Sequence, residues 1–395
     1  MVFNDIIGQN RTKTLLLQLA QSERIPHALL FLGPTGSGNL AMAVAFAQLI
    51  QCEKRWTVDG GRSTADDLFQ NGEPADGNQQ LATAEGACGE CPACRKAAQF
   101  THPDIHFSFP TVGTNAVSTD YLKQWRSALS ENPYMDVNAW LQRIGAENKQ
   151  GNITKEECNA IIKKLSLKAF EGRYKILVMW LPEYLGKEGN RLLKLIEEPP
   201  EQTIFLLAAE NQDLILNTIL SRCQLVKTDL LSDEEVMEGL QQKRGLDANR
   251  ARQIAFLSDG DFNTALQIAD NPENDDARLL LDWLRKCWRG NGVELVKWTE
   301  EFAKLGRENQ KQFLHYGLHF LREMMALVAT GNPNLRLRPD ELATAQNMAK
   351  VLDFEKIAQL TALFNDNIYY VERNANPKIL FLDTSIQMNR ILKSA

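Results

Sequence analysis

A glycine-rich turn near the N-terminus has the spacing of a phosphate-binding loop. It reads Gly-Pro-Thr-Gly-Ser-Gly-Asn-Leu, with Gly33 and Gly38 where such a loop needs glycine and Gly36 between them. In a working loop the next residues are a lysine that holds the β- and γ-phosphates and a Ser or Thr that ligates Mg²⁺. Asn39 and Leu40 stand there and can do neither. The turn is either a degenerate phosphate loop, favoured by the strand before it and the helix after it, or a plain strand-to-helix turn.

The strand that should carry a magnesium-binding carboxylate ends in apolar residues. A hydrolysing site needs an Asp at this point to hold Mg²⁺, usually followed by a Glu that polarises the attacking water. Here the apolar run Ile176–Met179 continues into Trp180 and Leu181. The phosphate-binding lysine and the metal-binding aspartate are thus both replaced, independently of each other. These two replacements predict that the chain neither hydrolyses ATP nor binds it tightly.

Four cysteines have the spacing of a metal site. Cys88, Cys91 and Cys94 are separated by two residues each, and Cys52 follows the helix expected after the glycine turn. Four thiolates with such spacings suit a structural zinc ion. The alternatives are an iron–sulfur cluster and free thiols. Ferredoxin spacing expects a further Cys-Pro three residues on, where Ala98 and Gln stand instead, so we expect zinc.

The composition is that of a packed protein with a slight acidic excess. Of 395 residues, 44% are hydrophobic, and 44 Lys and Arg face 50 Asp and Glu, a net charge of −6. An acidic chain is poorly suited to hold duplex DNA by bulk charge, so any nucleic-acid contact is local or shared with partners. No apolar run reaches the ~20 residues that span a bilayer, and no secretory pattern opens the chain. We therefore expect a cytoplasmic protein without membrane contact, and reduced cysteines.

Short apolar runs alternate with helical segments over the first 228 residues. This alternation predicts βαβ units and a mostly parallel sheet. The stretch 56–87 is rich in Gly, Asp, Asn, Gln and Thr, and is expected to be a solvated insertion. The predicted strands are Ala28–Leu32, Asp104–Phe109, Lys175–Trp180, Thr203–Ala208 and Gln224–Lys227.

Helical patterns follow the last strand. Ser232 and Glu235 form a capping box that opens a helix ending near Gly245. A second helix is expected at about 247–257, a third after Gly260, and from about residue 274 the pattern is helical throughout. We therefore predict three domains: an α/β domain at 1–228, a helical lid at 229–272 and a helical C-terminal domain at 273–395.

Several segments together resemble the clamp-loader branch of the AAA+ proteins. Glu-Glu-Pro-Pro and Ser-Arg-Cys at their observed separation are the most specific of them. The segments that carry the resemblance are Phe3–Gln9, Pro26–Phe31, Gly33–Gly38, Asn190 with Leu192–Lys194, Glu197–Pro200, Thr218–Cys223 and Asn376–Lys378.

This resemblance implies the fold and the metal. It implies an AAA+ α/β domain with a degenerate phosphate loop, a lid, and a C-terminal collar domain for oligomerisation. It also supports a small zinc module at 52–94, with one cysteine upstream and three downstream. Both nucleotide sensors look altered, because Glu210 lies near the end of the fourth strand and Asn263 stands where the lid normally supplies an arginine.

The resemblance further implies a role for one arginine. In ring ATPases of this kind, the arginine of Ser-Arg-Cys projects across the subunit interface and stabilises the γ-phosphate of the adjacent subunit's ATP. Arg222 holds that position here, and a local ion pair is the alternative. The implied partners are the clamp-loader ATPase (tau/gamma) subunits and the delta subunit, and indirectly the sliding clamp and primed DNA.

The sequence is compatible with three functions. The preferred one is a non-hydrolysing clamp-loader subunit of DNA polymerase III that acts in DNA replication and supplies Arg222 to a neighbour. The alternatives are a divergent ATP-dependent DNA-processing ATPase and a stand-alone zinc-dependent DNA-binding protein. The apolar residues at the ATPase positions count against the first alternative, and the acidic balance counts against the second.

Overall fold

The chain folds into two compact units. The computed structural model describes residues 1–22, 25–56, 86–146, 149–270, 276–333 and 335–393, so the predicted insertion at 56–87 lies outside the described residues apart from its ends. The first unit is Met1–Leu246 with Ser258–Gln267, and the second is Asp247–Leu257 with Ile268–Ala395. The lid segment is thus divided between the units, and the three-domain boundaries stay a prediction.

A parallel five-stranded sheet forms the centre of the first unit, with strand order β2-β3-β4-β1-β5. All four strand pairings are parallel, which confirms the predicted sheet. β2 is shorter than predicted, because Asp104 lies before it and binds the backbone N–H groups of residues 170–172 with its carboxylate. The strands are β1 (Ala28–Leu32), β2 (Ile105–Ser108), β3 (Lys175–Trp180), β4 (Thr203–Ala209) and β5 (Gln224–Lys227).

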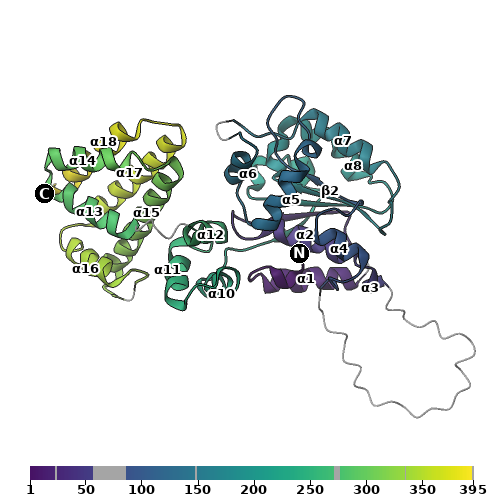
Figure 1. Ribbon diagram of the computed structural model, residues 1–395, viewed down its shortest axis with the longest axis horizontal. Coiled ribbons are helices and arrows are strands. Elements are labelled where there is room, and N and C mark those ends of the chain that lie inside the picture. Colours follow the sequence, from purple (N-terminus) through teal and green to yellow (C-terminus); the bar gives the residue numbers. More distant parts are fainter. Residues whose placement is uncertain (23–24, 57–85, 147–148, 271–275, 334, 394–395) are drawn as a thin grey trace, which may run out of the picture. The chain divides into compact units, whose positions relative to one another are not determined.

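Helices cover both faces of this sheet, with α2 on one side and α7 and α8 on the other (Figure 1). Alternate strand residues supply the two cores, since side chains of a strand point to opposite faces in turn. Leu29 and Phe31 of β1 belong to the core beneath α2, whereas Leu30 belongs to the core beneath α7. Every residue of α2 is buried, as its Ala-rich apolar sequence requires.

The helices of the first unit are mostly short. The capping box is confirmed: Ser232 Oγ accepts from the N–H of Glu235, and Glu235 accepts from the N–H of Ser232. The helices of this unit are η1 (Phe3–Asp5), α1 (Asn10–Gln21), α2 (Asn39–Gln51), α3 (Glu53–Trp56), α4 (Pro92–Ala98), η3 (Ser118–Tyr121), α5 (Leu122–Glu131), α6 (Val137–Arg143), α7 (Lys155–Leu165), η4 (Pro182–Arg191), α8 (Leu193–Glu197), η5 (Gln212–Leu214), α9 (Asn217–Leu220), α10 (Asp233–Arg244) and most of α12 (Phe262–Asp270).

The second unit is helical wherever it is described, as the sequence predicts. Its core is aromatic: the Trp283 ring stacks on Trp298 with centroids 5.0 Å apart, and Trp283 Nε1 donates to Ser385 Oγ at 2.9 Å. Among the described residues, no helix combines the length and apolar character needed to cross a bilayer. The helices of this unit are most of α11 (Ala248–Ser258), α13 (Asp276–Arg289), α14 (Gly292–Phe302), α15 (Arg307–Thr330), α16 (Pro339–Met348), α17 (Phe354–Glu372) and α18 (Pro377–Lys393).

Candidate functional site

The glycine turn joins β1 to α2 with the conformation that its glycines permit. Gly36 and Gly38 have φ of 74° and 90°, left-handed values that side-chain-bearing residues rarely adopt. Gly38 stands at the N-cap of α2, so the helix begins at Asn39 directly after the turn. The turn thus has the strand–turn–helix setting of a phosphate loop.

The residues at the lysine and hydroxyl positions are bound within the protein. Asn39 is 6% exposed, and its Nδ2 donates to the carbonyl oxygens of Gly33 at 3.2 Å and Ala209 at 2.7 Å. Leu40 is 2% exposed and belongs to the core. The Asn39 amide therefore ties the loop to the end of β4, and it is not directed at a ligand.

Groups of the same chain lie directly against the loop glycines, from the lid segment at Gly36 and from Tyr134 at Gly38. The N–H of Phe262 donates to Gly36 O at 3.3 Å, and a Cβ built on Gly36 would lie 1.7 Å from Asp261 Oδ1. A Cβ on Gly38 would lie 3.0 Å from the ring of Tyr134. The rings of Tyr134 and Phe262 themselves meet edge to face, with centroids 4.9 Å apart. The space against these two glycines is filled by side chains and backbone of the same chain.

The expected sensor position in the lid is also engaged within the chain. Asn263 is 2% exposed; its Oδ1 accepts from Asn132 Nδ2 at 2.8 Å, and its Nδ2 donates to Asp136 at 3.3 Å. Its amide is thus held between the end of α5 and the start of α6. The resemblance to the clamp-loader proteins implies an arginine at this position.

The end of β3 is packed into an aromatic cluster. Trp180 is 1% exposed and its ring lies 5.3 Å from that of Trp125, which stacks on Phe109 at 4.1 Å. Trp140 completes the cluster and donates from Nε1 to Pro110 O at 2.7 Å. The region 108–165 thereby supplies rings that bury the position where a metal-binding carboxylate would stand.

Buried carboxylates gather near the loop. Burial raises the pKa of Glu210 to about 7 and that of Asp261 to about 6, and neighbouring Asp136 adds to both. Burial also raises the pKa of Glu183, whose Oε1 accepts from the backbone N–H groups of Glu210 and Asn211. Additional negative charge from phosphate is disfavoured beside these groups.

Glu210 makes the stability of the first unit depend on pH. Because its pKa is raised on folding, the folded state holds the proton more tightly. The protonated Glu210 carboxyl therefore favours the folded state relative to the ionised one. This contribution to the free energy of unfolding is complete below about pH 4.5 and is lost as the pH rises through about 7. We expect Glu210→Gln to raise the free energy of unfolding at pH 8 by about 1–3 kcal/mol, and much less at pH 5. Urea unfolding at both pH values measures this, with exposed Glu201→Gln as the control; equal shifts at both pH values would contradict it.

Arg222 lies on the surface and forms an ion pair. Its side chain is 32% exposed, and Nη2 donates to the Glu197 carboxylate. Nη1 donates to Thr218 O at 2.5 Å and to Ser221 Oγ at 3.3 Å. The local ion pair that the sequence left open as the alternative role of Arg222 is thus present. The guanidinium is still partly exposed to solvent.

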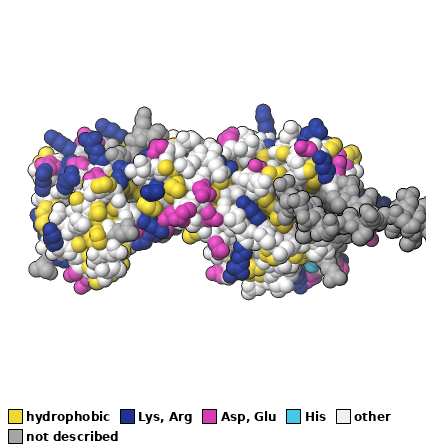
Figure 2. Space-filling model, turned by 90° about the horizontal axis from the view of Figure 1, so that it is seen from below, with side chains coloured by type: hydrophobic (Ala, Val, Ile, Leu, Met, Phe, Trp, Pro, Cys, Tyr) yellow, Lys and Arg dark blue, Asp and Glu magenta, His cyan; other side chains and the backbone are white. Residues whose placement is uncertain are grey.

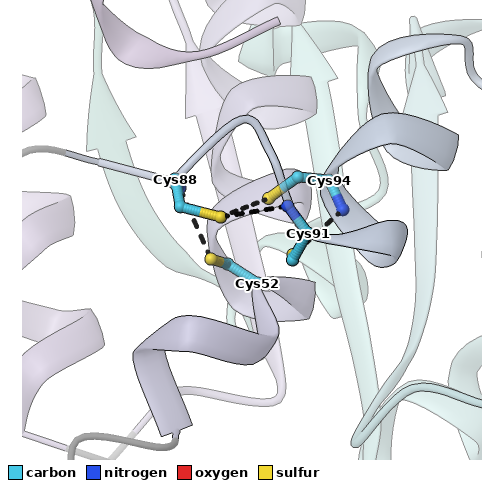
Figure 3. A group of neighbouring side chains, drawn as sticks. All are labelled: Cys52, Cys88, Cys91 and Cys94. Atoms are coloured by element: carbon cyan, nitrogen blue, oxygen red, sulfur yellow. Dashed lines mark hydrogen bonds between the residues drawn. The ribbon is translucent and has the colours of Figure 1, made fainter.

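The four predicted cysteines come together between the end of α2 and the start of α4 (Figure 3). The Sγ atoms of Cys52, Cys88, Cys91 and Cys94 all lie within 4.8 Å of one another. The Sγ atoms of Cys88 and Cys94 are 3.8 Å apart. Zn–S bonds of about 2.3 Å in a tetrahedron place sulfurs about 3.8 Å apart, so the cluster fits zinc.

The surroundings of the cysteines also suit thiolates. Backbone N–H groups of Cys88, Cys91 and Cys94 each donate to the Sγ of another cysteine of the set at 3.4 Å. The adjacent Cys52 thiol, burial and Cys91 raise the pKa of Cys94, a shift that a bound divalent cation reverses. The set offers four sulfur ligands with N–H support, which is the donor chemistry of a closed structural site.

The surface carries mixed charge on the face that Figure 2 draws. Lys and Arg side chains lie there on both units, several of them near one another on the C-terminal helical unit, and Asp and Glu side chains lie among them. The first turn of α10 alone holds Asp233, Glu234 and Glu235. This face of the described residues does not offer the basic stripe of a protein that holds DNA by charge alone.

Several residues of these sites were not identified from the sequence. Tyr134 and Asp261 lie against the glycine loop, and Asp136 accepts a hydrogen bond from Asn263. Tyr134 and Asp136 belong to no motif and lie about 100 residues after the loop. Glu197 was noted only as part of Glu-Glu-Pro-Pro, with no partner assigned. A possible signal was Asp261 after Gly260, since an Asp before a helix predicts an N-cap; its Oδ1 indeed accepts from the N–H of Asn263 and Thr264.

Comparison with known proteins gives consistent relatives. A family model described as "DNA polymerase III, delta subunit" matches residues 8–77 and 75–231. The chain is 22% identical to the DNA polymerase III subunit tau of Bacillus subtilis, over 96% of this chain and 60% of that protein. It is 23% identical to the delta' subunit of Bacillus subtilis, over 68% of this chain and 62% of that protein, and 26% identical to that of Yersinia pestis, over 56% and 44%.

Solved structures similar to this chain include that of a DNA polymerase III gamma subunit-related protein of Thermotoga maritima. The TM-score is 0.39, and the two chains are 12% identical over 95% of this chain and 99% of that one. The chain spans about three fifths of the length of the first curated relatives that it matches.

Proposed function

The chain belongs to the DNA polymerase III delta subunit family, whose model matches more than half of it, and from this premise we propose that it is a non-hydrolysing clamp-loader subunit. Its position would be that of delta-prime in the bacterial loader. There it supports ring assembly and supplies an arginine to a neighbouring ATPase subunit while the sliding clamp is loaded onto primed DNA during replication.

The closure of the glycine loop by groups of the same chain is the main support for this proposal. Asn39 bonds back into the loop, and Asp261 and Phe262 lie against Gly36. Trp180 replaces the metal-binding carboxylate inside an aromatic cluster. A triphosphate with its metal would have to displace these groups without a lysine to offset its charge, so hydrolysis in this chain's own site is disfavoured.

Arg222 is the residue through which this chain would promote ATP hydrolysis in the adjacent subunit. Its guanidinium is partly exposed and permanently charged, and its planar fork matches phosphate oxygens. In the proposed assembly it reaches the γ-phosphate held by the adjacent subunit. An arginine in this role changes the hydrolysis rate by about 10³ to 10⁵.

The zinc module has a structural role in this proposal. When bound, zinc supplies four metal–thiolate bonds and no open coordination position. The chain's own contribution is to bring Cys52, the C-cap of α2, beside Cys91, the N-cap of α4, and Cys94 within α4. This arrangement fixes α4 on the helix that also begins at the glycine loop.

Partners follow from the relatives named above. We propose contact with tau/gamma ATPase subunits and the delta subunit, and indirect contact with the clamp and primed DNA. The division into 1–228, 229–272 and 273–395 belongs to this proposal, with the last segment as the oligomerising collar.

Nucleotide binding by the purified chain tests the closed site. With Mg²⁺ and ATP, we expect no hydrolysis and no saturable binding by the isolated chain, whereas a tau/gamma subunit measured alongside binds and hydrolyses. Isothermal titration and phosphate release are suitable measurements. Co-purification with tau/gamma and delta, with DNA-stimulated ATPase dependent on this chain, is expected in addition. Tight Mg–ATP binding that Asn39→Asp removes would instead support the ATPase alternative.

A further inference from the structure

The surroundings of Arg222 fix one end of its guanidinium. A guanidinium carries five N–H groups in a rigid plane, one on Nε and two on each Nη. Nη1 uses both of its hydrogens, on Thr218 O and Ser221 Oγ, and Nη2 uses one on Glu197. These acceptors come from α8, from α9 and from the turn that follows α9.

The remaining donors lie together on one edge. Among the described residues, Nε–H and the second Nη2 hydrogen have no hydrogen-bond acceptor. Nε and Nη2 flank one of the edges through which arginine binds two oxygens of a carboxylate or phosphate at once. The side chain is therefore held through Nη1 and Nη2, and Nε–H and one Nη2 hydrogen are left for a further acceptor.

We propose that Glu197 is the positioning residue of Arg222: it orients the guanidinium so that the Nε–Nη2 edge faces the neighbouring subunit's γ-phosphate. This inference rests on the proposed function, and adds to it the residue that sets the arginine's geometry. The carboxylate binds one end of the fork and does not touch the phosphate.

Orientation, and not stability, is what the ion pair contributes. The two side chains are 32% and 42% exposed, and ion pairs at such positions stabilise a fold by about 0–1 kcal/mol. Replacing Glu197 therefore leaves the fold intact. It releases Nη2 and leaves the guanidinium held only through Nη1, on Thr218 O and Ser221 Oγ. Misplacement of a catalytic group by about 1 Å can cost about 10²-fold in rate.

Single-turnover hydrolysis of prebound ATP by the reconstituted loader tests this, because it resolves the sites by rate. With Glu197→Ala, we expect the phase that depends on Arg222 to slow by about 10- to 100-fold, with ATP affinity at that site unchanged. Glu197→Gln keeps an acceptor oxygen and is expected to recover part of the rate. Glu198→Ala, which removes an exposed charge one residue away, is the matched control and should leave the rate unchanged.

The outcomes separate this inference from the function on which it rests. If Arg222→Ala slows the phase and Glu197→Ala does not, Glu197 has no positioning role and the proposed function stands. If Arg222→Ala itself has no effect, the proposed function fails. Equal slowing by Glu197→Ala and Glu198→Ala would show a general charge effect and overturn the positioning role. Unchanged thermal unfolding of both variants confirms that the fold is intact.

Discussion

Arg222→Ala is expected to slow ATP hydrolysis at the adjacent subunit's site by about 10³-fold or more in the reconstituted loader. The reason is that the γ-phosphate gains negative charge in the transition state, and the partly exposed guanidinium is the group proposed to meet it. Since we propose that this chain has no working ATPase site of its own, the loss is expected in the activity of the neighbouring subunit. DNA-stimulated single-turnover hydrolysis measures it as the disappearance of one fast phase.

Two variants sharpen this experiment. Arg222→Lys keeps the charge but loses the planar fork, so we expect most of the loss to persist. Arg191→Ala removes another exposed arginine, one paired with Glu188 in η4, and should leave hydrolysis unchanged. Full activity of Arg222→Ala in a correctly assembled loader would refute the trans role.

Loss of the metal is expected to have the second large effect. We expect the purified chain to be colourless with about one equivalent of zinc, and Cys94→Ser to lose it. Cys94 is fully buried among the other sulfurs, so a missing ligand leaves the thiolates without the cation that offsets their repulsion. The free energy of unfolding of the first unit should fall by about 3 kcal/mol or more. Elemental analysis and urea unfolding provide the measurements.

The control for this prediction is Cys158→Ala. Cys158 is fully buried in α7 but belongs to the core on the other face of the sheet, so its replacement costs packing and should retain zinc. Visible absorbance with bound iron would identify an iron–sulfur cluster instead. Metal-free protein of undiminished stability would show that the thiols are free.

The sequence predicted the sheet well because its strands are continuous apolar runs. β1, β3 and β5 have the predicted bounds, and the turn from β1 into α2 was identified from glycine spacing. The cysteine set could also be predicted, since x₂ spacing brings three thiols onto adjacent turns. Asn39, Leu40 and Trp180 were identified because a known chemistry requires other residue types at those positions.

The closure of the loop could not be predicted in the same way. Asp261 reaches Gly36 across more than two hundred residues, and Tyr134 reaches Gly38 across about a hundred. Such contacts depend on tertiary packing and leave no local pattern. The Glu197–Arg222 pair is another example: both residues were noted, but only the fold brings α8 beside the end of α9. The division of the lid segment between two units likewise has no counterpart in the helical pattern.

Helix α2 imposes a strict limit on insertions and deletions. It is buried on every side, begins at the glycine loop and ends directly before Cys52. One added residue would turn everything beyond it by about 100° and advance it by about 1.5 Å. Cys52 would then leave its sulfur neighbours, and apolar side chains along the helix would meet the wrong partners. The geometry of the helix therefore fixes the number of residues between the loop and the first cysteine.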